Sequence, residues 1–151
     1  MAASRQQTDA GTGATPTGTP LALLLGQAER QVARALEQVL GDLTVDQWRV
    51  LDLLATSGAG AGRPMSEIAA TVAVPSPTLT KIVDRLVDSA LVFRLPDDHD
   101  RRRVLVFPSD AGRELHARIA PGVAVAEADA LAALGADASV LLDLLGRLTR
   151  R

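Results

Sequence analysis

The chain contains no cysteine and few aromatic residues. Without cysteine it has no disulfide framework, no thiolate zinc site, no cysteine nucleophile and no thiol-based redox sensor. Aromatic residues make up only 2% of the chain, which argues against binding of single-stranded nucleic acid through stacked bases. The apolar run at residues 21–25 is far shorter than the ~20 residues that a membrane-spanning helix needs. We therefore expect a soluble, unsecreted protein of the cytoplasm with no membrane partner.

What remains is the composition of one folded domain. Apolar residues make up 47% of the 151 residues and charged residues 23%, enough to bury a core of ordinary size. The net charge is -2, so any binding to nucleic acid depends on a local basic patch. Residues 1–20 are rich in threonine, glycine, alanine and proline, which predicts a disordered tail and a single domain over residues 21–151.

Apolar residues at helical spacing predict a mainly α fold. A first helix is expected over residues 21–40, ending near Gly41. Thr44 and Gln47 have the spacing of a capping box, which predicts a second helix whose buried face includes Trp48. The segment SGAGAGRP, residues 57–64, predicts a flexible connector.

Two short helices follow, separated by a tight turn. The first is expected over residues 66–73, because Pro75 disfavours helical backbone at Val74. Pro77 suits the first position of a helix and holds Ser76 extended, so we expect Ser76 to cap a helix that begins at Pro77. Such a pair is the pattern of a helix-turn-helix, whose second helix binds the major groove of DNA. Candidate contacts on that helix are Ser76, Thr78, Thr80, Lys81 and Arg85.

A strand-like pattern then replaces the helical one. Residues 92–95 and 103–107 predict a β-hairpin with a charged tip between its strands. Any two short amphipathic helices in an all-α protein would give the helix pattern described above. The hairpin behind them favours a winged helix-turn-helix, in which it is the wing.

The hairpin tip carries a triplet of arginines. Strand alternation is expected to place Arg101 and Arg103 on one face and Arg102 on the other. Asp100 is expected to hold a guanidinium through a paired hydrogen bond. A charge run of this kind is most often a solvated surface, but this arrangement favours a role in binding. The acidic residues and His99 at the tip are too close in sequence to converge on one ion, so neither a metal nor a cofactor is expected.

The last part of the chain is helical again. Ser109 is expected to cap a long helix with a kink at Pro121, and a final helix is expected over residues 137–148. His116, on the long helix, has no serine or acid partner identifiable in the sequence, and no nucleophile motif is present. We therefore expect no catalytic residues and no enzyme activity.

Together these motifs resemble the MarR family of winged helix-turn-helix regulators, over most of residues 21–148. Two departures are Ala73 and Ala90, which replace the usual glycines of two turns, so slightly different turn geometry is expected. The segments that carry the resemblance are LTVDQWRVL at 43–51, SEIA at 66–69, SPTLTKIVDRL at 76–86, LVFR at 91–94, DRR at 100–102 and SDAGR at 109–113.

The resemblance implies a six-helix chain with a small β-wing that forms a homodimer. Residues 21–40 and 109–150 would form the dimer, and residues 44–108 the DNA-binding part. The implied partner is a palindromic operator in double-stranded DNA. The implied function is transcriptional regulation, most often repression, in many cases with release by a small-molecule effector.

The family pattern also adds residues to the candidate site. Asp100 and Arg102 match the acid and the arginine of the family's wing, and Arg102 is the residue expected to enter the minor groove. The alternative function is a winged-helix module for dimerisation or protein interaction without operator binding. The full candidate DNA-binding set is Ser76, Thr78, Thr80, Lys81, Arg85, Asp100, Arg101, Arg102 and Arg103.

Overall fold

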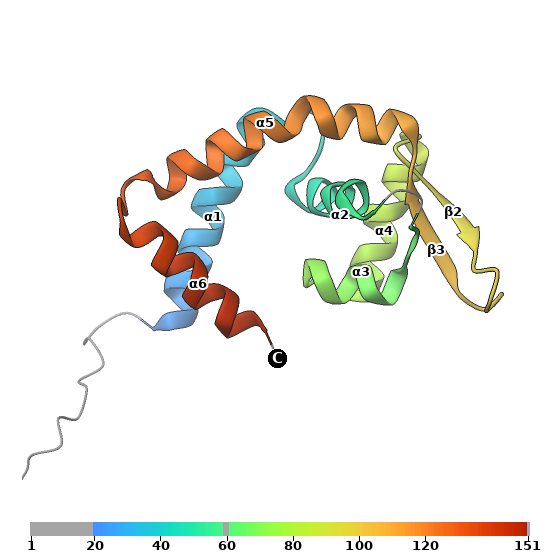
Figure 1. Ribbon diagram of the computed structural model, residues 1–151, viewed down its shortest axis with the longest axis horizontal. Coiled ribbons are helices and arrows are strands. Elements are labelled where there is room, and N and C mark those ends of the chain that lie inside the picture. The colour runs from blue at the N-terminus through green and yellow to red at the C-terminus, as the bar shows by residue number, and fades with distance from the viewer. Residues whose placement is uncertain (1–19, 59–60, 151) are drawn as a thin grey trace, which may run out of the picture.

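The computed structural model describes residues 20–58 and 61–150. Within them the chain forms six helices and one small antiparallel sheet, as predicted (Figure 1). The predicted tail lies outside the described residues, apart from Pro20 at the start of the first helix. The elements in chain order are α1 (Leu21–Leu40), α2 (Val45–Thr56), β1 (Arg63–Pro64), α3 (Met65–Val72), α4 (Ser76–Asp88), β2 (Val92–Pro96), β3 (Val104–Pro108), α5 (Asp110–Ala132) and α6 (Asp137–Thr149).

The elements form two groups that α5 joins. Figure 1 shows α5 running from the β2–β3 hairpin at one end to α1 and α6 at the other. We call residues 44–108 the winged-helix region, and residues 21–40 together with 109–150 the helical region. The long helix is continuous through Pro121, and the kink that the sequence predicts there stays a prediction.

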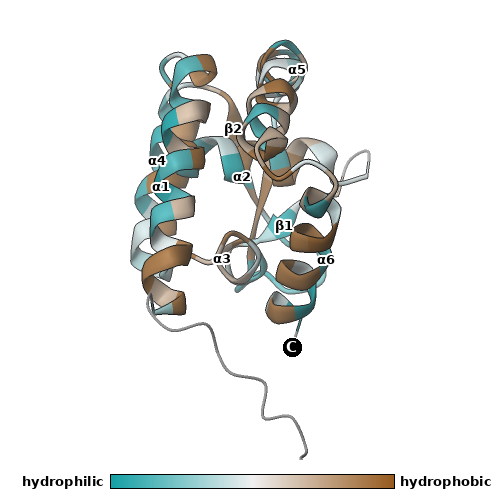
Figure 2. Cartoon of the chain, turned by 90° about the vertical axis from the view of Figure 1, so that its left-hand side faces the viewer, coloured by the Kyte–Doolittle hydropathy of each residue, from teal (hydrophilic) through white to brown (hydrophobic). Residues whose placement is uncertain are grey.

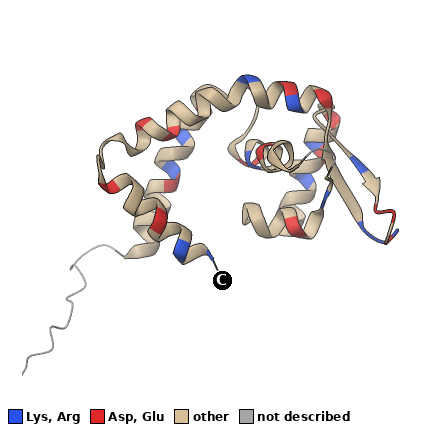
Figure 3. Ribbon diagram, in the orientation of Figure 1, with Lys and Arg blue, Asp and Glu red and all other residues tan. Residues whose placement is uncertain are grey.

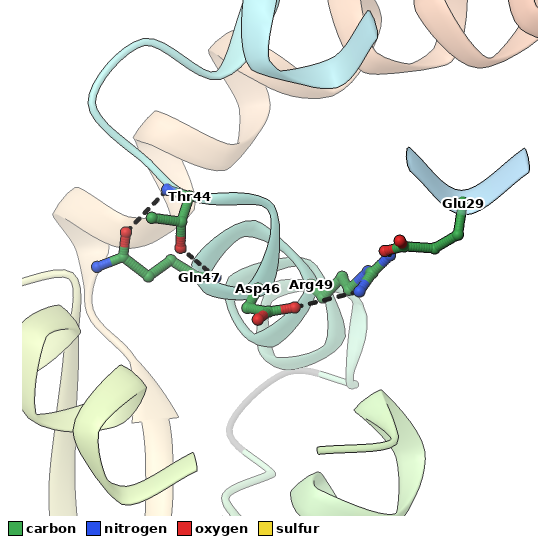
Figure 4. Close-up of polar contacts among 5 residues, drawn as sticks. All are labelled: Glu29, Thr44, Asp46, Gln47 and Arg49. Atoms are coloured by element: carbon green, nitrogen blue, oxygen red, sulfur yellow. Dashed lines mark hydrogen bonds and ion pairs between the residues drawn. The ribbon is translucent and has the colours of Figure 1, made fainter. Parts of the chain in front are cut away.

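Local caps define the helix ends that the sequence predicted. Gly41, with φ of 62°, follows the last residue of α1. The Thr44 hydroxyl accepts a hydrogen bond from the Gln47 amide at 3.2 Å, and the Gln47 side chain accepts one from the Thr44 amide at 2.8 Å (Figure 4). Ser109 caps α5 by accepting a hydrogen bond from the Gly112 amide at 2.9 Å. The predicted capping box and the predicted serine cap are both confirmed.

The start of α4 differs from the prediction by one residue. The helix begins at Ser76, and Pro75 takes the N-cap position with φ of -60° and ψ of 144° and no side-chain hydrogen bond. The proline ring already fixes the backbone close to what an N-cap needs, so the helix starts before Pro77. Ser76 is therefore a helical residue and not the cap.

The end of the predicted connector is a strand. Arg63 and Pro64 form β1, which pairs with β3 opposite Val106 and Leu105, so the strand order is β1-β3-β2. Two residues are too few to show an alternating pattern, and the sequence therefore predicted only a loop there. Before β1, a Cβ on Gly62 would overlap the Phe107 ring, so this close approach needs glycine.

The two turns without glycine keep left-handed backbone. Ala73 has φ of 56° and ψ of 40°, and Ala90 has φ of 56°. In each turn the amide of the residue after the alanine closes the helix end, from Val74 to the Ala69 carbonyl at 3.2 Å and from Leu91 to the Leu86 carbonyl at 2.9 Å. Both alanines thus take the left-handed backbone that glycine adopts readily, at about 1–2 kcal/mol each. The expected difference from the family's turns stays a prediction.

The core is divided between the two regions. The helical region shares a smaller cluster with α2, made of Leu36, Leu40, Trp48 and Val123. Trp48 is buried there, as predicted. The larger cluster lies in the winged-helix region: Val50, Leu51, Leu54, Ile68, Leu79, Ile82, Val83, Leu86, Leu91, Val92 and Val106.

Candidate nucleic-acid interface

The outer face of α4 is polar and exposed. Its inner face packs into the larger cluster through Leu79, Ile82, Val83 and Leu86, as the spacing predicted. This packing leaves the predicted contact residues in solvent, and the Thr80 hydroxyl donates a hydrogen bond to the Ser76 carbonyl at 3.1 Å. The exposed side chains of this face that were predicted as contacts are Ser76, Thr78, Thr80, Lys81 and Arg85.

The wing tip is a hydrogen-bonded turn. The Asp97 amide donates to the Arg103 carbonyl at 3.0 Å, and the Arg103 amide donates to the Asp100 carbonyl at 2.8 Å. The Asp100 carboxylate accepts a hydrogen bond from the Arg102 amide at 3.0 Å. Asp100 therefore stabilises the turn through a backbone amide and pairs with no guanidinium of the described residues, so that prediction is wrong.

The arginine triplet lies in this turn and not in a strand. Since β3 begins only at Val104, strand alternation does not decide where the three side chains point. Arg103 lies 3.8 Å from the Asp97 carboxylate. The difference arises because aspartates favour local hydrogen bonds to backbone amides two residues on, which bend the chain before the strand starts.

Four basic side chains of the candidate set have no carboxylate partner among the described residues. They lie on α4 and at the wing tip, and all four are exposed. Figure 3 shows basic residues along α4 and at the tip of the hairpin beside it. These cations are available to an external anion. They are Lys81, Arg85, Arg101 and Arg102.

One ion pair joins α4 to the wing. Arg94 of β2 donates to the Asp84 carboxylate of α4 at 2.7 Å. The sequence prediction did not include this contact. Its only signal in the sequence is a basic residue two positions after the apolar Val92, and so on the same side of the strand as that buried valine.

Two further polar contacts join elements that are distant in the sequence. His116 of α5 lies 2.8 Å from the Asp52 carboxylate of α2 and stacks on Trp48, with ring centroids 5.1 Å apart. The acid partner that the sequence did not reveal for His116 is thus Asp52. Arg49 of α2 contacts Glu29 of α1 at 3.3 Å and also Asp46 (Figure 4). Both contacts hold the two regions together.

The described residues give no sign of a metal cluster or a membrane span. No group of three potential metal ligands lies together among them. None of their helices combines the length and the apolar character that crossing a bilayer requires.

A cavity lies where the two regions meet. It measures about 460 Å³, and its lining comes from α1, the loop after it and the first turns of α2. Half of its ten lining residues are charged. They are Glu29, Glu37, Asp42, Asp46 and Arg49.

Comparison with known proteins identifies the same architecture in characterised regulators. A solved structure of a probable transcriptional regulator from Pseudomonas aeruginosa is 30% identical, with a TM-score of 0.76 over 85% of this chain and 96% of that one. The transcriptional repressor CouR, solved on a 23-mer DNA duplex, is 30% identical, with a TM-score of 0.74 over 87% of this chain and 93% of that one. NadR, solved with 4-hydroxyphenylacetate, is 28% identical, with a TM-score of 0.75 over 90% and 96%. A search by sequence among curated proteins found no match.

The family model agrees with the structural neighbours. The model of the MarR family matches residues 41–103, which cover the winged-helix region apart from its last strand. The neighbours extend the similarity over the helical region as well. The chain is a member of the MarR family of winged-helix transcriptional regulators.

Proposed function

We propose that the protein is a homodimeric repressor that binds a palindromic operator in double-stranded DNA. The observation that carries the proposal is the set of four cations, Lys81, Arg85, Arg101 and Arg102, which have no carboxylate partner among the described residues. They lie on two adjoining elements whose shapes suit the major and the minor groove. Binding of CouR to a DNA duplex supports the same function here.

The proposed roles follow from where each side chain lies. Ser76, Thr78 and Thr80 lie on the first turns of α4, where free amides and the helix dipole favour a phosphate. Lys81 and Arg85 would contact phosphates or bases. At the wing, Arg101 would contact the backbone, Arg102 would enter the minor groove, and Asp100 would hold the turn that presents them. Arg103 would contribute less, since Asp97 partly neutralises it.

The apolar surface of the helical region supports the homodimer. None of the residues of α6 is buried in one chain, and the N-terminal end of α1 is also apolar and exposed (Figure 2). A second copy would remove this surface from water at ~25 cal/mol per Å² of apolar area. Two-fold symmetry would then place the two α4 helices in successive major grooves ~34–36 Å apart.

Release by a small molecule is the finer part of the proposal. NadR was solved with 4-hydroxyphenylacetate, and this complex of a structural neighbour supports an effector here. The cavity beside α1 and α2 is a poor site for such an acid, because its charged lining is mostly carboxylates. Addition of such acids to the protein on its operator is the measurement, and release at a defined concentration is the expected result. Unchanged binding with every acid tested would remove this part and leave DNA binding intact.

The experiment that tests DNA binding is footprinting of genomic fragments followed by titration over a range of salt concentrations. We expect protection of an imperfect palindrome, with half-sites one helical turn apart. Lys81→Ala and Arg102→Ala should each weaken binding and reduce the salt slope by about 1 per half-site. Arg118→Ala, which removes the same charge from an exposed position on α5, is the matched control.

The same titration separates the proposal from its alternative. A protein-interaction module would remain dimeric and show no preference for any sequence. Unchanged affinity and salt slope in Arg102→Ala, with binding abolished in Lys81→Ala, would mean that the wing is passive. Because exposed charges contribute only about 0–1 kcal/mol to stability, both variants should stay folded.

A further inference from the structure

The Arg94–Asp84 pair is the polar side-chain link, outside the apolar core, between the proposed major-groove helix and the wing. Among the described residues, no other side-chain hydrogen bond or ion pair joins α4 to β2 or β3. The pair is short, at 2.7 Å, and both side chains are partly exposed, at 33% for Arg94 and 51% for Asp84. It therefore lies at the edge where the helix and the hairpin meet solvent.

Strand geometry explains why Arg94 reaches α4. Arg94 lies opposite Val106 in the β2–β3 ladder and two positions after Val92, and both valines are buried. Because side chains alternate along a strand, Arg94 lies on the core side of the hairpin, toward α4. Its neighbours Phe93 and Leu95 lie on the opposite, exposed side.

Without its contact to Arg94, the charge of Asp84 would be unfavourable for DNA binding. Asp84 belongs to the exposed face of α4, between Lys81 and Asp88, and a carboxylate there repels DNA phosphates. By charge alone, removal of Asp84 should tighten DNA binding. The contact with Arg94 gives this carboxylate a different role.

We propose that Arg94 is a positioning residue that acts through Asp84 to fix the angle between the wing and α4. The pair holds the arginines of the wing tip at the distance from α4 that lets both elements meet one face of a duplex. It also neutralises Asp84 against the phosphates. This inference rests on the proposed DNA binding, but the geometric part of it holds without DNA.

The DNA test compares two aspartates of one helix. Asp84→Asn and Asp88→Asn remove the same charge from neighbouring turns, but only Asp84 pairs with the wing among the described residues. We expect Asp84→Asn to weaken operator binding by up to about fivefold, the equivalent of one exposed ion pair, and to lose protection at the minor-groove flanks. Asp88→Asn should bind as tightly as the unaltered protein or more tightly. Arg94→Ala should match Asp84→Asn, and Arg94→Lys should recover part of the loss.

A measurement without DNA tests how firmly the wing is held against the helix-turn-helix. The chain contains no cysteine, so His99→Cys at the wing tip and Ala70→Cys on α3 provide two unique sites for spin labels. In labelled protein diluted with unlabelled protein, Asp84→Asn should broaden the distance distribution between the labels. Asp88→Asn should leave it unchanged, and circular dichroism should show that both variants stay folded.

Each outcome decides between the possibilities. An unchanged distance distribution in Asp84→Asn overturns the proposal whatever happens with DNA, and so does binding of Asp84→Asn as tight as that of Asp88→Asn. Broadening together with weaker operator binding supports it. If the unaltered protein binds no DNA, the proposed function fails, and the label distances alone then decide whether the pair fixes the wing.

Discussion

The winged-helix region and the helical region differ in how much of their apolar surface one chain buries. In the winged-helix region, eleven buried residues form one continuous cluster, and Leu51 within it is fully enclosed. The helical region shares a cluster of only four, and α6 leaves Leu144 51% and Leu148 58% exposed. The first region is complete within one chain, while the second keeps an apolar surface that suits a partner.

The largest expected effect concerns that surface. Leu144→Asp together with Leu145→Asp places two charges on α6, and burying them in a dimer would leave each without a partner. We expect monomers or unfolded protein. Analytical ultracentrifugation at micromolar concentration measures this, and a stable monomer of the unaltered protein would contradict the proposed dimer.

A second change contrasts the two regions directly. Leu51→Ala removes atoms from an enclosed core and should lower the free energy of unfolding by ~2–5 kcal/mol. This loss should be the same at every protein concentration, because the site lies within one chain. Leu144→Ala should instead lower the free energy of unfolding by an amount that grows as the protein is diluted. Urea denaturation at two concentrations distinguishes them, and equal behaviour of both variants would remove the contrast between the regions.

A third change compares two glycines of α5, one in its first turn and one near its middle. A Cβ on Gly112 would overlap the Leu91 carbonyl oxygen, so Gly112→Ala should destabilise the protein by about 1–3 kcal/mol through overpacking. Gly122→Ala is the matched control on the same helix, since its Cβ would meet Val39 only at 3.6 Å. Thermal unfolding should separate the two variants, and equal melting temperatures would mean that the contact with Leu91 relaxes easily.

The smallest expected effect is a gain in stability within the winged-helix region. Ala73→Gly and Ala90→Gly relieve left-handed alanines, at the cost of a more flexible unfolded chain. We expect a net gain of about 0.5 kcal/mol for each. Ala70→Gly, at a regular position of α3, should lose up to about 1 kcal/mol. Denaturation of the three variants checks the sign, and a loss at Ala90 would mean that its turn is not strained.

What the sequence predicted well depends on neighbours along the chain. Thr44 and Gln47 lie three positions apart, and their spacing alone defines where α2 begins. The inner face of α4 follows from helical periodicity in the same way. These features need only the local backbone, so a single sequence contains them.

What the sequence did not predict depends on contacts between distant segments or on very short elements. Asp52 and His116 are separated by 64 positions, and nothing in either segment marks the other. The strand Arg63–Pro64 is too short to have a period. At the wing tip, the Asp100 carboxylate could accept a hydrogen bond from a guanidinium or from a backbone amide. The fold of the turn brings the Arg102 amide to it, and this depends on contacts that the sequence alone does not give. Which candidate side chains contact DNA stays a prediction.

The length of α5 has a mechanical consequence. Its 23 residues form a rod that contacts both regions, with Gly112 packed against the turn before the wing and Val123 packed beside α1. A rotation of about 10° about one end of a helix about 35 Å long moves the other end by about 6 Å. Such a displacement exceeds the rise of one base pair, so a small change in how two copies pack would be amplified into a change of register at the DNA.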